Sequence, residues 1–67
     1  MIQLIINGQS QQFAAPLNVA QLIDHLSLQG KRIAIERNGT IVPRSQFTEQ
    51  LLVHGDRLEV VIAVGGG

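Results

Sequence analysis

The residues with the clearest chemical potential are the last four, Val64-Gly65-Gly66-Gly67, which follow an apolar stretch. Glycine has no β-carbon, so such a tail can enter a slot that is too narrow for side chains. Its last group is the unhindered α-carboxylate of Gly67. A carboxylate is a poor acyl donor, but an enzyme that converts it to a mixed anhydride makes the acyl group available to a nucleophile. The same residues also fit a solvated chain end or a linker, so the rest of the chain has to decide.

Other catalytic and metal-binding patterns are weak. The chain has no cysteine, and His25 and His54 lack the spacing of metal ligands. No serine lies in a nucleophile elbow, and the spacing of the acidic residues shows no close carboxylate pair. The five basic residues, Arg37 among them, are interpreted as solvated. We therefore expect no catalytic residue, no metal site and no bound cofactor.

Composition limits the classes of protein that fit. A chain of 67 residues has room for one domain, and 45% apolar with 15% charged residues favours a folded one. The zero net charge gives no basic surface for phosphates, and two phenylalanines are too few for base stacking, so nucleic-acid binding is not expected. No apolar run reaches the length of a membrane span, and no secretory leader is recognised. We expect a small, soluble, cytoplasmic protein that is monomeric when free.

The N-terminal third predicts a hairpin. Apolar residues alternate over residues 1–7, which predicts a strand with Ile2, Leu4 and Ile6 on one face. Asn7-Gly8 is typical of a tight hairpin turn. A returning strand is predicted over residues 11–14, with Phe13 directed at the core.

A helix follows the hairpin. Asn18 and Gln21 have the spacing of a capping box, and Leu17 and Leu22 occupy the two positions of a hydrophobic staple. The pattern predicts two to three helical turns in a segment that Gly30 ends. The apolar stripe of this helix has helical spacing and comprises Val19, Leu22, Ile23 and Leu26.

Two more short strands are predicted in the next segment. Residues 32–37 alternate, and Asn38-Gly39 is a second tight-turn signal that leads into Ile41-Val42. Pro43 cannot donate a hydrogen bond to a ladder, so this edge strand ends there.

A connection without strands precedes the last strand. Ser45 is expected to cap a single helical turn that carries Phe47 inward. Leu51 and Leu52 are expected to lie in the core beneath a loop, before a turn at residues 54–56.

The last strand is predicted over residues 57–63. Val61 and Ala63 then lie on the uncovered face of the sheet, where they are expected beside Ile5. An exposed apolar patch next to a functional tail is typical of a partner surface, to which Val64 also belongs. The alternate residues are expected to face the helix, namely Leu58, Val60 and Ile62.

The order of elements predicts an α+β domain. One helix covers one face of a mixed sheet of four to five strands. The domain is predicted to span residues 1–63, with residues 64–67 as the C-terminal tail.

Three segments together resemble the ThiS family of sulfur carriers in thiamin biosynthesis. The resemblance spans the whole chain and implies the ubiquitin-like β-grasp fold, in which the first and last strands are adjacent and parallel. The segments are Asn38-Gly39-Thr40-Ile41-Val42-Pro43-Arg44, Gly55-Asp56-Arg57-Leu58-Glu59 and Ala63-Val64-Gly65-Gly66-Gly67.

The resemblance also implies a mechanism. A ThiF-like adenylating enzyme uses ATP and Mg²⁺ to convert the Gly67 carboxylate to an acyl-adenylate. A sulfur donor, such as a cysteine desulfurase persulfide, displaces AMP and leaves a thiocarboxylate, whose sulfur a ThiG-like thiazole synthase takes. Gly65 and Gly66 are the threading residues, and Gly67 is the covalent participant. On this interpretation the chain is a protein cosubstrate and has no enzymatic activity.

Two alternatives remain open. A molybdopterin-type sulfur carrier shares the fold and the tail but is usually longer and lacks the Val42-Pro43-Arg44 segment. A non-covalent β-grasp interaction module would carry a chemically idle tail.

Overall fold

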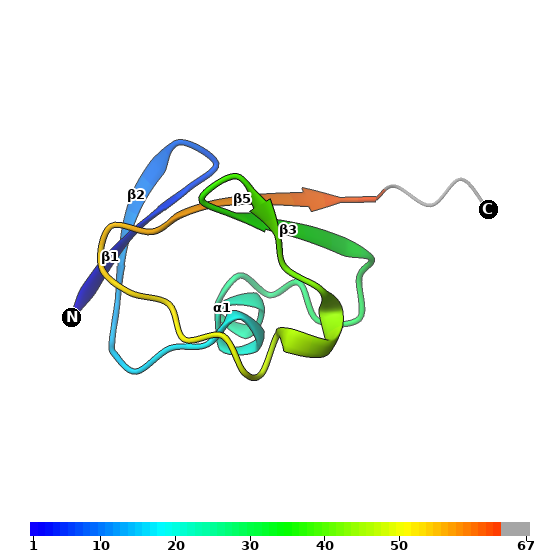
Figure 1. Cartoon of the computed structure of the whole chain (residues 1–67), viewed down its shortest axis with the longest axis horizontal. Helices are drawn as coiled ribbons and strands as arrows, with labels where there is room; N and C mark the ends of the chain where they lie inside the picture. The colour runs from blue at the N-terminus through cyan, green and yellow to red at the C-terminus, as the bar shows by residue number, and fades with distance from the viewer. Residues whose placement is uncertain (64–67) are drawn as a thin grey trace.

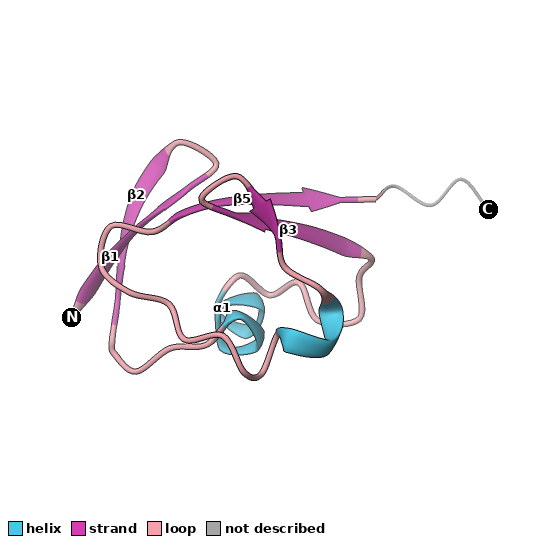
Figure 2. Cartoon of the chain, in the orientation of Figure 1, coloured by secondary structure: helices cyan, strands magenta, loops and turns pink. Residues whose placement is uncertain are grey.

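A mixed sheet forms one layer of the computed structural model, and a single α-helix covers one of its faces (Figures 1 and 2). The structure describes residues 1–63. In this part of the chain the sheet has five strands in the order β2-β1-β5-β3-β4. β5 lies in the centre, parallel to β1 and antiparallel to β3, which confirms the predicted fold class. The elements are β1 (Ile2–Ile6), β2 (Gln9–Phe13), α1 (Val19–His25), β3 (Ile33–Arg37), β4 (Thr40–Ile41), the 3₁₀ turn η1 (Arg44–Gln46) and β5 (Arg57–Ile62).

Both Asn-Gly pairs form the predicted tight turns. Asn7 and Gly8 have φ values of 50° and 82°, as a two-residue hairpin turn requires. Such a turn returns directly into the ladder, so Gln9 pairs with Ile6 and β2 begins two residues earlier than predicted. The run of polar residues over 9–12 hid this start, because it shows no apolar alternation.

The helix begins as predicted and ends sooner. The Asn18 side chain accepts from the Gln21 N–H at 2.7 Å, and the Gln21 side chain accepts from the Asn18 N–H at 2.8 Å, so the capping box is confirmed. The helix ends at His25 with Leu26 as its C-cap, well before Gly30. Ser27 there adopts the left-handed φ of 58°, which a helix cannot continue through.

The core lies between the sheet and α1. Leu51 is 58% exposed and Ile62 is 43% exposed, so their predicted core positions are wrong. The Leu52 N–H donates to the Leu17 carbonyl, which turns Leu52 inward and its neighbour outward. Ile62 shares the helix-facing side of β5, but it lies at the end of that strand, where the core packing stops. The buried core residues are Leu4, Ile6, Phe13, Leu17, Val19, Leu22, Ile23, Ile35, Val42, Leu52 and Leu58.

The segment after the second hairpin departs from prediction in two places. β4 spans Thr40–Ile41, one residue earlier than expected, although the Val42 N–H still donates to the Ile35 carbonyl at 2.8 Å. Ser45 lies inside η1 and caps nothing, because Pro43 occupies the N-cap position. Phe47 packs against the core as predicted.

Candidate functional site

The site is built around the end of β5. Ala63 is the last residue that the structure describes, and its N–H donates to the Arg32 carbonyl at 2.8 Å. The predicted threading and covalent residues, Gly65, Gly66 and Gly67, lie outside the described residues, as does Val64. The geometry of the site therefore comes from the strand that leads into the tail and from the surfaces on either side of it.

The asparagines of the two hairpin turns also hold β5. Asn7 Oδ1 accepts from the Val60 N–H at 2.8 Å, and its Nδ2 donates to the Val60 carbonyl at 3.1 Å. On the other side of the strand, Asn38 Oδ1 accepts from the Arg57 N–H at 2.9 Å. Sequence reasoning identified both asparagines only as turn formers. The side-chain amide continues the ladder where the neighbouring strand has ended, and this depends on tertiary placement.

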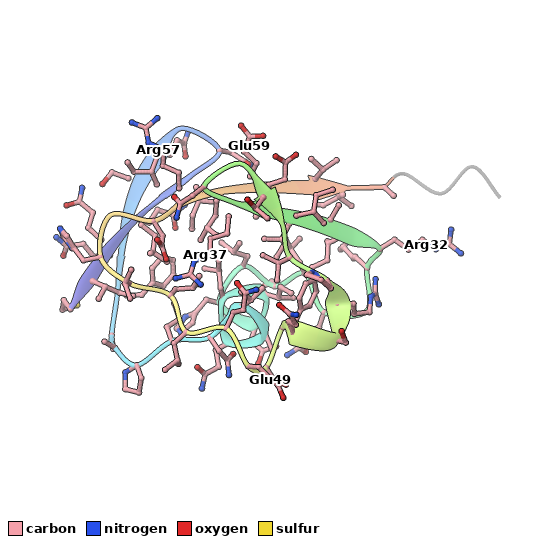
Figure 3. The ribbon with its side chains drawn as sticks, in the orientation of Figure 1. Arg32, Arg37, Glu49, Arg57 and Glu59 are labelled. Carbon is pink, nitrogen blue, oxygen red and sulfur yellow. The ribbon has the colours of Figure 1, made fainter. Side chains whose placement is uncertain are left out.

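Asp56 anchors the start of β5 from the helix side of the sheet. Its carboxylate accepts from Arg37 Nε at 3.0 Å and Nη2 at 2.8 Å, from Asn38 Nδ2 at 3.0 Å and from the Val53 N–H at 2.9 Å. Arg37 accordingly lies beneath the sheet (Figure 3), so the interpretation of Arg37 as a solvated residue is wrong. Burial alone raises the pKa of Asp56, but these hydrogen bonds and the charge of Arg37 outweigh it and lower the pKa below 3.8.

The predicted docking residues lie on the face of the sheet opposite α1. Val61 is 58% exposed and Ala63 is exposed, as expected. Ile5 is half-buried on the same face, but the expectation that it lies beside Val61 is wrong. The parallel register pairs Ile5 with Arg57, and Val61 lies four residues further along β5. Their roles in docking stay predictions.

Register adds residues to this surface that the sequence did not reveal. Ala34 lies opposite Val61, and Glu36 lies opposite Glu59 on β5 and opposite Ile41 on β4. Glu59 projects from the face of the sheet away from α1 (Figure 3). The sequence spacing did not reveal this pair of acidic residues, because positions 36 and 59 are brought opposite each other only by strand pairing. We define the outer patch as the exposed apolar residues with this acidic pair, namely Ala34, Ile41, Val61, Ala63, Glu36 and Glu59.

The outer patch has a distinct chemical character. Like charges directly opposite on a sheet are destabilising, so Glu36 and Glu59 are not explained by stability. Within residues 1–63 the only ion pair joins Arg37 to Asp56, on the other side of the sheet. The outer patch therefore suits a partner that presents apolar and cationic side chains together.

The histidines have structural contacts. His25 packs edge-on against Phe13, with ring centroids 5.4 Å apart. His54 Nδ1 accepts from the Gln3 N–H at 3.0 Å. Over the described range, no group of three or more potential metal-ligating side chains comes together. No helix in that range is long and apolar enough to span a membrane.

The sheet order, the parallel pairing of β1 with β5 and the single covering helix define a ubiquitin-like β-grasp protein. The ThiS family model matches residues 4–67, and the chain belongs to the ThiS family. The crystal structure of the thiamine biosynthesis protein ThiS from Geobacter metallireducens superposes with a TM-score of 0.84 at 30% identity, and covers 98% of this chain and 100% of that one.

Two relatives in sequence bear on function. The sulfur carrier protein ThiS of Escherichia coli K12 is 30% identical over 66 residues, which cover 98% of this chain and 100% of the relative. The thiazole synthase of Paramagnetospirillum magneticum is 38% identical over 66 residues, which cover 98% of this chain. The chain spans only 20% of the length of that thiazole synthase.

Proposed function

We propose that this protein is a sulfur carrier of thiamine biosynthesis that bears its sulfur on the C-terminal carboxylate of Gly67. The observation that carries the proposal is the match to the ThiS family model, which runs from Leu4 through Gly67. The central position of β5 supports it, because the strand that leads into the tail is anchored in the sheet by β1 and Asn7 on one side and by β3 as far as Ala63 on the other.

The chemistry proceeds in three steps, with a partner enzyme and a sulfur donor. A carboxylate oxygen of Gly67 attacks the α-phosphorus of ATP, with Mg²⁺ on the phosphates, and pyrophosphate leaves. The terminal sulfur of a persulfide, such as that of a cysteine desulfurase, then attacks the acyl carbon and AMP leaves. A thiol cleaves the resulting disulfide and releases the thiocarboxylate. The chain supplies no catalytic residue and acts as a protein cosubstrate.

The contribution of the chain is presentation. Gly65 and Gly66 thread the acyl group into a narrow active site, since neither has a side chain to obstruct it. The outer patch docks the ThiF-like adenylating enzyme, which supplies apolar contacts and cationic side chains for Glu36 and Glu59. ATP and Mg²⁺ are substrates of that enzyme, and the free carrier is a monomer in the cytoplasm.

The acceptor of the sulfur is a ThiG-like thiazole synthase. Two relatives named thiazole synthase, from Paramagnetospirillum magneticum and Magnetococcus marinus, each contain a stretch similar to this chain that amounts to a fifth of their length. A carrier-like segment within the same polypeptide as the synthase supports a direct transfer between the two.

Intact mass spectrometry tests the proposal. The protein is incubated with the adenylating enzyme, ATP, Mg²⁺, a persulfide donor and a thiol. The expected product has the mass change of one oxygen atom replaced by sulfur, and this change disappears when ATP is omitted. An unchanged mass in the presence of an adenylating enzyme that is active on a known ThiS protein would overturn the proposal.

A further inference from the structure

A groove lies on the helix side of the sheet, at the same end of β5 as the outer patch. Its volume is about 390 Å³, and no charged residue contributes to its walls. The end of β5 forms one side, and the end of α1 and the strand β2 form the others. We call it the inner groove, and its principal lining residues are Gln9, Leu26, Leu28, Val60 and Ile62.

The backbone of β5 is open at Ile62, the last of its residues that lines the inner groove. The Asn7 N–H donates to the Leu58 carbonyl, and the Asn7 side chain then pairs with both backbone groups of Val60. Ile62 is the next residue whose backbone faces this side, since the neighbouring Ala63 N–H is directed at β3 and donates to the Arg32 carbonyl. Across residues 1–63, β1 has ended by this point and nothing pairs with Ile62 on this side.

The side chain of Ile62 is also incompletely covered, with 43% of its surface exposed. The groove is uncharged, and its lining combines five apolar side chains with three side-chain amides. An open backbone edge beside such a groove is an arrangement to which an extended peptide adds as a strand. Main-chain hydrogen bonds then supply affinity, and an apolar side chain in the groove supplies specificity.

We propose that an extended, uncharged segment of the thiazole synthase adds to β5 at Ile62 and places an apolar side chain in the inner groove. This rests on the proposed function and names the surface by which the sulfur acceptor recognises the carrier. The site lies immediately before the residues that lead to Gly67, so a strand paired there sets the direction in which the tail leaves the domain. The adenylating enzyme is assigned to the other face of the sheet, where Glu36 and Glu59 would attract cationic side chains.

A matched pair of glutamine variants tests the groove. Gln9 lines it, whereas Gln12, on the same strand, pairs with Gln3 on the opposite face. Both are exposed, so Gln9→Lys and Gln12→Lys change charge equally without disturbing the core. We expect Gln9→Lys to weaken binding to thiazole synthase about tenfold, because a cation would be enclosed in an interface to which the groove contributes no acidic partner. Gln12→Lys should bind as the parent does.

A backbone variant tests the strand pairing. Ile62→Pro removes an N–H that the sheet of the carrier does not use, so the domain should remain folded. We expect a loss of about tenfold or less in affinity for thiazole synthase, as for one backbone hydrogen bond. In the complex formed by the parent protein, hydrogen exchange at the Ile62 amide should slow.

The outcomes separate the two proposals. A parent protein that acquires no sulfur in the mass assay would overturn the proposed function and this inference with it. A parent that acquires sulfur, but binds thiazole synthase as tightly in both the Gln9→Lys and the Ile62→Pro variants, would overturn this inference alone. Loss of adenylation in Gln9→Lys to the same extent as loss of synthase binding would also overturn it, since the groove would then not be selective for the acceptor.

Discussion

Asp56 is the only buried charged residue within residues 1–63, with 5% of its surface exposed. It joins the end of β3 and the turn that follows it, through Arg37 and Asn38, to the loop before β5, through the Val53 N–H. A carboxylate with this many donors is stabilising only in the ionised form. The start of the central strand therefore depends on one charge.

This charge predicts a pH dependence of stability. The pKa of Asp56 is lowered in the folded state, so its contribution is complete above the ordinary value of 3.8 and is lost as the pH falls through the folded pKa. Asp56→Asn should lower the free energy of unfolding by about 2–3 kcal/mol at pH 7, because Arg37 loses its partner. Urea unfolding at several pH values should show the difference between parent and variant shrinking below pH 3.8.

Glu59→Gln is the matched control for this change. It also converts a carboxylate to an amide, but on the exposed face opposite Glu36. Its free energy of unfolding should stay within about 0.5 kcal/mol of the parent. An equal loss in the two variants would contradict the role assigned to Asp56.

At the scale of the elements, β5 separates two surfaces. Its outward residues contribute to the outer patch, and its inward residues contribute first to the core and then to the inner groove. Val61 lies in the middle of the outer patch, between Ala63 and the acidic pair. A substitution there should change binding without changing the core.

Val61→Asp should therefore weaken binding to the adenylating enzyme by at least about tenfold, since it removes apolar contact and adds a third negative charge to the outer patch. The free energy of unfolding should fall by about 1 kcal/mol or less, the cost of aspartate in an exposed strand. Titration calorimetry and urea unfolding measure the two effects. Leu51→Asp is the control, because Leu51 is equally exposed, at 58%, on a different part of the chain. Equal losses of affinity in both variants would refute a specific patch.

Local signals predicted the elements well, and tertiary placement accounts for what they missed. The capping box of Asn18 with Gln21 and both Asn-Gly turns depend on neighbours in sequence, and all are present. Alternation assigned Ile62 to a face correctly, but it does not say where along the strand the core packing stops. The acidic pair depends on register, which one sequence does not encode in its spacing.

At the scale of the whole molecule, the fold and the proposed chemistry occupy different parts of the chain. Within residues 1–63, the buried core residues lie between Leu4 and Leu58, and the predicted covalent residue is Gly67. Deleting Gly66 and Gly67 should leave the free energy of unfolding within about 0.5 kcal/mol of the parent. The same deletion should abolish sulfur acceptance in the mass assay. A large loss of stability would contradict this separation of roles.

Addition of one residue after Gly67 should also abolish sulfur acceptance. The added residue should not affect the fold, but it displaces the terminal carboxylate by about 3.3 Å from the position at which the adenylating enzyme activates it. Thermal unfolding with the mass assay distinguishes this result from a folding defect. Full sulfur acceptance by the extended protein would show that activation does not require the carboxylate at a fixed distance from the domain.

The sulfur that this protein carries is predicted to enter the thiazole and not molybdopterin. The thiocarboxylated protein should support thiazole formation with thiazole synthase and should not support molybdopterin synthesis. The residues by which partner enzymes distinguish the two kinds of sulfur carrier must lie outside the shared glycines. Arg44 is a candidate, because Pro43 fixes the place where the chain leaves the edge strand. Both reactions are reconstituted from one thiocarboxylated preparation. Product in the molybdopterin assay alone would reject the pathway while retaining the sulfur chemistry.

The parallel pairing of β1 with β5 has a consequence for biosynthesis of the protein. β5 is the latest strand in chain order, yet it lies between β1 and β3. The two hairpins can form during translation, but they have no shared sheet until β5 leaves the ribosome, so closure depends on contacts that are distant in sequence. A nascent chain that stops before β5 lacks its central strand and should be removed as an unfolded protein. Assembly of the sheet therefore waits for the synthesis of β5.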